Sequence, residues 1–253
     1  MKLLVRWSLT LGLAGSVMFA GILGINNLQA FALPEEQVIK ILQKVPVFTL
    51  TYPKGEFVVF SGKNQSKTIS QIGFFISKKD AKFFLEDQIK KNPQLASTIQ
   101  IRDFPLAYYY KLAVENSKKK DSGVIFTLFP TEQQVDSAKS ILTSSGKPVQ
   151  QFNGIPLFLA KVSKKGYLTI PIPQEKERFV PIFFEKEQAV ALLEEFKKAV
   201  PKEAANTEIE VTKLSSVIDT LTNSKDPTMS KFLLYPSRES IEFLNSPPKQ
   251  PKK

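Results

Sequence analysis

The chain of 253 residues contains neither cysteine nor histidine. Without cysteine there is no disulfide framework and no thiolate nucleophile. Without histidine the commonest general base, metal ligand and pH switch of proteins are all missing. The ordinary catalytic triads are therefore excluded, and only a Ser–Lys arrangement or an all-oxygen metal site stays open as a basis for catalysis.

Motifs that bind phosphates or metals are missing as well. No D-x-D-x-D-G calcium loop occurs, and the glycines stand singly rather than in a phosphate-binding loop. Neighbouring carboxylates such as Glu194 and Glu195 stand beside Lys197 and Lys198, which is typical of ion pairs on a solvent-exposed helix. We therefore predict that the protein is not an enzyme and uses no cofactor and no metal.

Apolar and basic side chains, by contrast, are abundant. The composition is 42% hydrophobic, enough for a sizeable core, and the net charge of +11 favours anionic partners. No RNA-binding aromatic motif accompanies the scattered basic clusters, so we expect no nucleic acid as a partner. A solvated basic surface is the plainer interpretation, and peripheral contact with an acidic membrane surface is the alternative. The clusters are Lys78-Lys79, Lys90-Lys91, Lys118 to Lys120, Lys164-Lys165 and Lys197-Lys198.

Residues 1–32 are typical of a secretory signal peptide. Lys2 and Arg6 precede a charge-free apolar stretch from Leu9 to Ile25, and Ala30-Phe31-Ala32 has the A-x-A form of a cleavage site. The chain is therefore predicted to be exported, with the mature protein beginning directly after this site. The length of the apolar stretch leaves an uncleaved membrane anchor as the competing interpretation.

The remaining sequence repeats itself. The segment from Ile72 to Pro93 matches the segment from Val180 to Pro201 at a fixed offset of 108, with a strand running into an amphipathic helix in both. Two further pairs of segments match at an offset of 110. Val45 to Phe48 matches Ile155 to Phe158, and Ile99 to Ile101 matches Ile209 to Val211. The chain is thus predicted to consist of two related halves, residues 33–144 and 145–245, followed by a disordered basic tail over residues 246–253.

Each half is expected to be a sheet covered by helices, which gives an α+β fold with two pseudo-symmetric halves. Short connections between the first three strands favour an antiparallel meander, and crossover helices add strands that can be parallel. Thr131, followed by Gln134, has the pattern of a capping box at a helix start. In the first half, strands are predicted over residues 45–51, 57–60, 69–77, 98–102 and 123–129, and helices over residues 33–43, 78–92, 106–115 and 131–143.

Adjacent aromatic residues show where apolar cover is needed. Phe74-Phe75 and Phe183-Phe184 occupy neighbouring strand positions, which point to opposite faces of a sheet. Packing by a helix on one face and by the other half on the opposite face is one explanation, and an open apolar groove is the other. Tyr108 to Tyr110 cannot all share one helical face, so at least one ring must lie at the surface.

Six segments, distributed through nearly all of the chain after residue 32, carry a family resemblance through their order and spacing. They are Val45 to Thr51 (VPVFTLT), Phe75 to Leu85 (FISKKDAKFFL), Gly154 to Ala160 (GIPLFLA), Gly166 to Pro173 (GYLTIPIP), Pro181 to Lys198 (PIFFEKEQAVALLEEFKK) and Tyr235 to Ser240 (YPSRES). No single motif among them is diagnostic. Together they resemble the Tic-twenty-two (Tic22) family, the small soluble component of the translocon at the inner chloroplast envelope, in a cyanobacterial form.

The resemblance implies a duplicated fold with flat apolar grooves and a chaperone-like role in protein transport. In a cyanobacterium this role would lie in the periplasm, with the thylakoid lumen as a second location, and would serve outer-membrane biogenesis. Its expected partners are unfolded precursor proteins and the barrel-insertion machinery of the outer membrane. The alternative is a non-catalytic docking module of a membrane translocation assembly. The groove candidates nominated on this basis are Phe48, Phe75, Leu157, Phe158 and Phe183.

Overall fold

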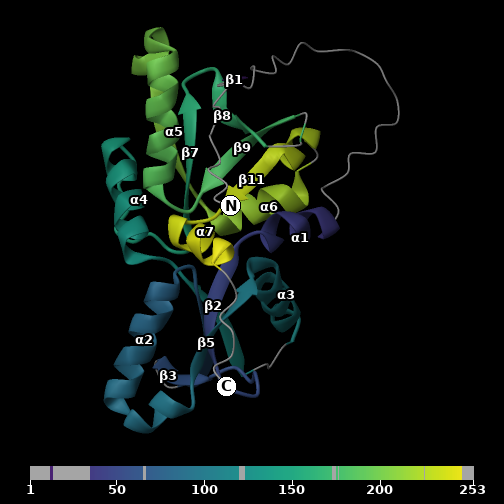
Figure 1. Ribbon diagram of the computed structural model, residues 1–253, viewed down its shortest axis with the longest axis vertical. Helices are drawn as coiled ribbons and strands as arrows, with labels where there is room; N and C mark the ends of the chain where they lie inside the picture. The colour runs from purple at the N-terminus through teal and green to yellow at the C-terminus, as the bar shows by residue number, and fades with distance from the viewer. Residues whose placement is uncertain are drawn as a thin grey trace.

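A computed structural model describes residues 12–13, 35–64, 67–119, 123–172, 175, 177–224 and 226–246 (Figure 1). The predicted signal peptide lies outside the described residues, apart from the two-residue strand β1 (Gly12–Leu13), which pairs antiparallel with a strand of the second half. The predicted basic tail, from residue 247 onward, lies outside them too. The cleavage of the leader and the disorder of the tail therefore stay predictions.

The first half forms a five-stranded sheet around a central strand. This strand, β4, pairs antiparallel with β3 and β2 and parallel with β6, and β5 continues the sheet beyond β2. One helix covers each face, α2 on one side and α3 on the other. The elements are α1 (Glu35–Gln43), β2 (Pro46–Thr51), β3 (Phe60–Asn64), β4 (Lys67–Phe75), α2 (Lys78–Lys91), η1 (Pro93–Ser97), β5 (Gln100–Pro105), α3 (Leu106–Ser117), β6 (Val124–Phe129) and α4 (Glu132–Ser144).

The second half repeats this order with nearly the same pairings, except that β7 also pairs directly with β8. Its central strand β9 pairs antiparallel with β8 and β7 and parallel with β11, and β10 lies beyond β7. Both halves are thus mixed sheets covered by helices, as the sequence predicts. The elements are β7 (Pro156–Val162), β8 (Gly166–Pro171), β9 (Arg178–Phe183), α5 (Lys186–Ala199), η2 (Pro201–Asn206), β10 (Thr207–Lys213), α6 (Leu214–Asn223), η3 (Pro227–Lys231), β11 (Phe232–Tyr235) and α7 (Arg238–Asn245).

Equivalent contacts are found within each of the two halves. Phe48 on β2 stands opposite Phe75 on β4, and Phe158 on β7 stands opposite Phe183 on β9. In each half the backbone N–H at the start of the second covering helix donates to the carbonyl just before the first strand of the sheet. These bonds run from Leu106 to Val45 (2.7 Å) and from Leu214 to Ile155 (2.9 Å).

Two predictions about the strands are wrong in detail. The predicted hairpin partner of β2, residues 57–60, forms a single bridge at Phe57 and one backbone bond at Val58 before the chain turns onto β4. The strand order is therefore β3-β4-β2 and not a simple meander. The pairing registers also match Ile209 with Ile101 and not with Ile99. Both alignments keep the same side chains on the same face, because a shift of two residues preserves the strand period.

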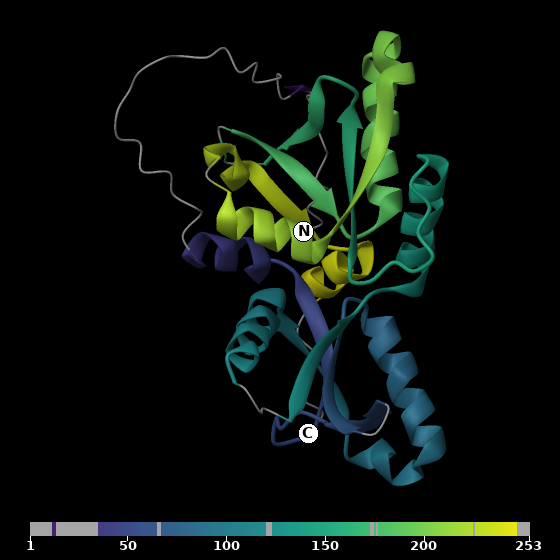
Figure 2. The same ribbon diagram turned by 180° about the vertical axis from the view of Figure 1, so that it is seen from behind.

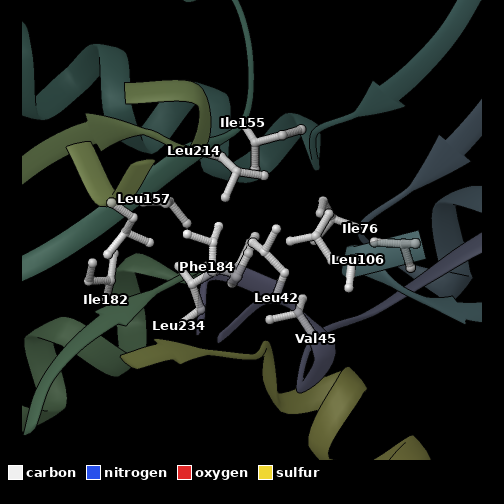
Figure 3. Close-up of a cluster of buried hydrophobic side chains, with 14 of the residues drawn as sticks. Leu42, Val45, Ile76, Leu106, Ile155, Leu157, Ile182, Phe184, Leu214 and Leu234 are labelled. Carbon is white, nitrogen blue, oxygen red and sulfur yellow. The ribbon is translucent and has the colours of Figure 1, made fainter. Parts of the chain in front are cut away.

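One apolar core is shared by the two halves (Figure 3). Equivalent residues of the two halves belong to this one cluster, for example Val45 and Ile155, or Leu106 and Leu214, and all four are at most 6% exposed. Leu42 of α1 is fully buried in the same cluster. Helix α1 contacts both α3 and α6, so it closes the core at the junction of the halves. The pseudo-symmetric halves therefore share this core, and further apolar clusters lie on the other face of each sheet.

The last helix of each half packs on the other half. Helix α4 lies against β7, β10 and α5 of the second half, and Figures 1 and 2 show it beside α5. Helix α7 makes the reciprocal contact: its Phe243 ring meets Phe48 of the first half edge-on, with 5.2 Å between the ring centres. The two terminal helices are thus exchanged between the halves.

Polar contacts at helix starts hold this exchange in place. Glu239 of α7 accepts hydrogen bonds from the Ser77 hydroxyl (2.7 Å) and the Lys79 backbone N–H (2.8 Å) at the start of α2. In the other direction, Gln134 of α4 accepts from the Lys186 backbone N–H (2.9 Å) at the start of α5. The predicted capping box is wrong. Thr131 is the N-cap residue of α4 but makes no side-chain cap, and the Gln134 side chain bonds to the other half in place of the Thr131 backbone N–H.

Candidate binding cavities

The structure places all five groove candidates in the interior. Phe48, Leu157 and Phe158 are 0% exposed, and Phe75 and Phe183 are 5% exposed. They lie in three clusters: Phe48 with Phe75, Phe158 with Phe183, and Leu157 in the shared core. None of them forms a flat surface groove, because α7 covers the first pair and α5 with α4 covers the second. Their contact with a client stays an untested prediction.

Phe183 lines an open cavity of about 390 Å³, which we call the α5 cavity. It lies between α5, the sheet strands β8, β9 and β11, and the start of α7. Its floor is apolar and its rim carries one carboxylate and one guanidinium. The lining residues are Ile170, Phe183, Gln188, Ala191, Leu192, Glu195, Tyr235 and Arg238.

A second cavity of about 280 Å³, the α6 cavity, opens on the other face of the same sheet. Ile182 lines it, whereas its neighbour Phe183 lines the α5 cavity, and adjacent strand residues point to opposite faces. Further lining residues include Leu159, Tyr167, Glu210, Thr212, Ser216, Val217, Met229 and Phe232.

A small polar cluster forms one wall of the α6 cavity. The Tyr167 hydroxyl donates to Glu210 (2.9 Å), and Lys161 donates to the other oxygen of the same carboxylate (2.6 Å). Burial opposes ionisation of Glu210, but these two hydrogen bonds outweigh it and lower the pKa of Glu210. Burial and the bond to Glu210 raise the pKa of Tyr167 to about 12. The cluster is therefore a satisfied ion pair with a neutral phenol, and it supplies no base poised to take a proton near neutral pH.

The first half fills the space that corresponds to the α6 cavity. Strand registers match Tyr167, Ile182, Thr212 and Ser216 with Phe57, Phe74, Phe104 and Tyr108. In the first half these four aromatic rings pack together, with centres 5.6 Å apart for Phe57 and Phe74 and 5.0 Å for Phe104 and Tyr108. Smaller side chains at three of the four positions leave the α6 cavity open in the second half.

The α5 cavity has a filled counterpart as well. Ile170 and Leu192 of the second half correspond to Phe60 and Phe84 of the first. The Phe84 ring meets Phe60 edge-on at 4.9 Å and lies 5.4 Å from Phe75, the equivalent of Phe183. Replacing two phenyl rings by two aliphatic side chains thus leaves room between α5 and the sheet.

The tyrosine-rich helix α3 behaves as its sequence predicts. Tyr108 is 39% exposed and stacks on Phe104, with an interplanar angle of 18°. Tyr109 and Tyr110 pack against the shared core. The rings therefore wedge the helix onto the sheet, and Tyr108 is the ring at the surface.

Acidic groups gather where the four helices α2, α4, α5 and α7 begin. Burial raises the pKa of Asp80, and the nearby charges of Glu239 and Glu132 raise it further. Burial likewise raises the pKa of Glu185, against the lowering effect of Arg238. Within the described part of the chain, no group of three or more acidic side chains is arranged to hold a metal ion. These carboxylates belong to the junction between the halves.

The fold and its cavities define a duplicated α+β protein with two apolar recesses in its second half. Comparison with known proteins agrees with this class. The Tic22-like family profile matches residues 16–246, and the chain belongs to that family. In the part of the chain that the structure describes, no helix is long and apolar enough to span a membrane.

Solved structures of similar fold include proteins from Anabaena and Plasmodium falciparum. Anabaena Tic22, described as a protein-transport protein, superposes with a TM-score of 0.75 and 28% sequence identity, covering 87% of this chain and 100% of the other. Tic22 from Plasmodium falciparum superposes with a TM-score of 0.61 at 21% identity, covering 82% of this chain and 96% of the other. The second likeness concerns the fold alone.

Similar curated sequences are chloroplast proteins. Protein TIC 22 of Arabidopsis thaliana is 25% identical over 162 residues, which cover 64% of this chain and 54% of the relative. Protein TIC 22 of Pisum sativum is 23% identical over 158 residues, covering 62% and 55%. The chain thus spans about half the length of the curated relatives it matches.

Proposed function

We propose that the protein binds unfolded precursor proteins in the periplasm and holds them for insertion into the outer membrane. The observation that carries this proposal is the pair of open apolar cavities on opposite faces of the second sheet. A factor that holds extended chains needs places for apolar side chains but no reactive groups. Membership of the Tic22-like family, together with the transport role of the Anabaena relative, supports it.

Charge adds to this recognition. The chain carries a net charge of +11, which raises the local concentration of acidic segments and speeds their encounter. Residue-specific recognition would come from the cavities, and long-range attraction from the lysines. Contact with the barrel-insertion machinery of the outer membrane, or with its acidic surface, belongs to the same proposal.

Aggregation of a client tests the proposal directly. A denatured outer-membrane barrel protein is diluted from urea into buffer with the purified protein, and light scattering is recorded. We expect suppression at a near-equimolar ratio. Filling both cavities by the double variant L192F/S216Y, which installs the residue types of the first half, should weaken suppression. Substituting the buried Phe75 or Phe183 by Ser is a poorer test, because it would disrupt the core.

The matched control is S215Y, which adds the same ring one position away on α6, at an exposed residue outside the cavity. It should suppress aggregation like the unmodified protein. Absence of suppression by the unmodified protein itself would favour the second candidate, a docking module that binds one membrane partner and touches no client.

A further inference from the structure

Strand β8 lies at one side of the second sheet, where a segment from the leader pairs with it. The strand order runs β1-β8-β7-β9-β11, so β8 is the outermost strand on this side apart from β1. Gly12 pairs with Thr169 and Leu13 with Leu168 in antiparallel register, and Figure 1 shows β1 beside β8. A segment more than a hundred residues away in the chain thus adds a strand to this edge.

The β8 edge lacks the residues that usually protect an edge strand from further pairing. Its sequence, GYLTIP, has no charged residue, and tyrosine, threonine and isoleucine all favour extended backbone. The counterpart β3 reads FSGKN, with a lysine and an internal glycine, and it pairs with β4 alone among the described residues. Pro171 ends the part of β8 that can pair, because proline has no N–H to donate.

Arg178 of β9 holds the middle of β8 on the sheet. Its guanidinium donates to the hydroxyl (2.9 Å) and to the backbone carbonyl (2.7 Å) of Thr169. A backbone carbonyl accepts two hydrogen bonds, so this contact is compatible with a neighbouring strand, and β1 pairs at the same residue. An added strand therefore meets a template that is already in place, which lowers the entropic cost of binding.

The two faces of β8 lead to the two cavities. Ile170 lines the α5 cavity and belongs to the same apolar cluster as Leu168. Tyr167 lines the α6 cavity, where its hydroxyl bonds to Glu210. Thr169 shares the face of Tyr167, because alternate residues of a strand point the same way. One face of β8 is thus apolar, and the other carries hydroxyl groups.

We propose that the β8 edge binds an extended segment of the precursor as an added antiparallel strand, with apolar side chains beside Leu168 and polar or small ones beside Thr169. β1 follows this pattern, since Leu13 stands opposite Leu168 and Gly12 opposite Thr169. The strands of outer-membrane barrels alternate in the same way. Main-chain hydrogen bonds provide the affinity, so one edge serves many sequences of this alternation. The inference rests on the holding role proposed above and names the contact that holds the client.

Peptides with blocked backbone N–H groups test the inference. Three labelled peptides share the core Thr-Leu-Thr-Leu-Thr: one is unmodified, one is N-methylated at the leucines and one at the threonines. Alternate N–H groups of a strand point to opposite edges, so only one methylated set faces β8, and turning the peptide over would exchange its apolar and polar faces. In fluorescence anisotropy with the full-length protein, we expect one methylated peptide to bind at least about tenfold more weakly than the unmodified one, and the other within about twofold of it.

Variants of the leader and amide hydrogen exchange locate the bound peptide. Replacing both Gly12 and Leu13 by proline removes both N–H groups of β1, so the unmodified peptide should bind at least about threefold tighter. In that variant the bound peptide should slow amide exchange in β8 and not in β3. The matched control replaces Gly21 and Ile22 by proline, a second Gly-apolar pair of the leader, and should leave the peptide affinity unchanged.

Three outcomes would overturn the inference. Equal binding of all three peptides would show that side chains alone are captured, and protection confined to segments other than β8 would place the peptide elsewhere. Concentration-dependent dimers of the Gly12/Leu13 proline variant, with β8 protected in the absence of peptide, would assign the edge to a second copy. In each of these cases the aggregation assay can still show suppression, so the holding role is judged by its own measurement.

Discussion

Leu192 on α5 takes the position in the second half that Phe84 on α2 takes in the first. The smaller side chain opens a cavity of about 390 Å³, while the phenyl ring of its counterpart is packed at 4.9 Å from Phe60. The two halves thus share a backbone arrangement, while several side chains that line the cavities on both faces of the second sheet are smaller than their counterparts in the first half. The first half therefore shows how equivalent positions pack when aromatic rings fill the space that is open in the second half.

The first prediction concerns this pair. Leu192→Phe should stabilise the protein by about 1 kcal/mol by filling the cavity, whereas Phe84→Leu should destabilise it by about 1 kcal/mol by opening one. Urea unfolding at equilibrium measures both. A destabilised Leu192→Phe would mean that the ring is overpacked and that the two positions are not interchangeable.

The second prediction compares two helix starts with the same sequence pattern. Ser237 caps α7 through its hydroxyl, which accepts from the Ser240 backbone N–H (3.1 Å). Thr131 at the start of α4 makes no such bond. Ser237→Ala should therefore cost about 1 kcal/mol, and Thr131→Ala less than about 0.5 kcal/mol. Equal losses in thermal unfolding would contradict the assignment of the two caps.

The third prediction tests the exchange of the terminal helices. Phe243→Ala removes the ring that packs on Phe48 and that Lys78 approaches at 4.5 Å. We expect a loss of about 2 kcal/mol and faster amide hydrogen exchange in α2 of the first half. Leu244→Ala, one residue on and 57% exposed, is the matched control and should be nearly neutral. Faster exchange confined to α5 would show that α7 packs on its own half.

The fourth prediction concerns pH. Burial and the charges of Glu239 and Glu132 raise the pKa of Asp80 in the folded protein. The folded state then binds a proton more readily than the unfolded state, so the Asp80 carboxylate lowers stability above its folded pKa and this cost disappears as the pH falls through that value. Asp80→Asn should therefore stabilise the protein at neutral pH and have little effect in acid.

Urea unfolding at pH 7 and near pH 4 measures the difference. Asp87→Asn on the same helix is the control, since its carboxylate pairs with Lys91 and its removal should bring no gain at neutral pH. A stabilising effect of Asp80→Asn that is the same at both pH values would attribute it to packing or helix propensity instead.

Much of the fold could be predicted because it follows from local patterns. The recurrence of strand and helix at an offset of 108 reveals the duplication, and the boundaries of α2 lie within one residue of those expected. The strand order could not be predicted from the sequence. Alternation of apolar and polar residues along a strand determines which face of the sheet each residue occupies, but it does not determine which strand lies next to it. The register of β10 differs from the expected one by two residues for the same reason.

The candidate site shows the same division. Sequence reasoning selected Phe183 as an apolar contact, and it lines the α5 cavity. It missed Leu192 and Gln188, although the repeat carried a usable signal in the replacement of Phe84 by Leu192. This replacement predicts a cavity only if it is known that Phe84 and Leu192 each face their sheet across an equivalent gap.

The sequence by itself determined the absence of the cysteine and histidine on which the ordinary catalytic triads depend, the two related halves, and the α+β class, since these follow from residue types and their spacing along the chain. The tertiary structure alone decided that α4 and α7 change places and that the halves share one core. It also decided that the second sheet carries open cavities. Each of these depends on contacts between residues far apart in the chain, whose energies come from shape and burial, which no local pattern records.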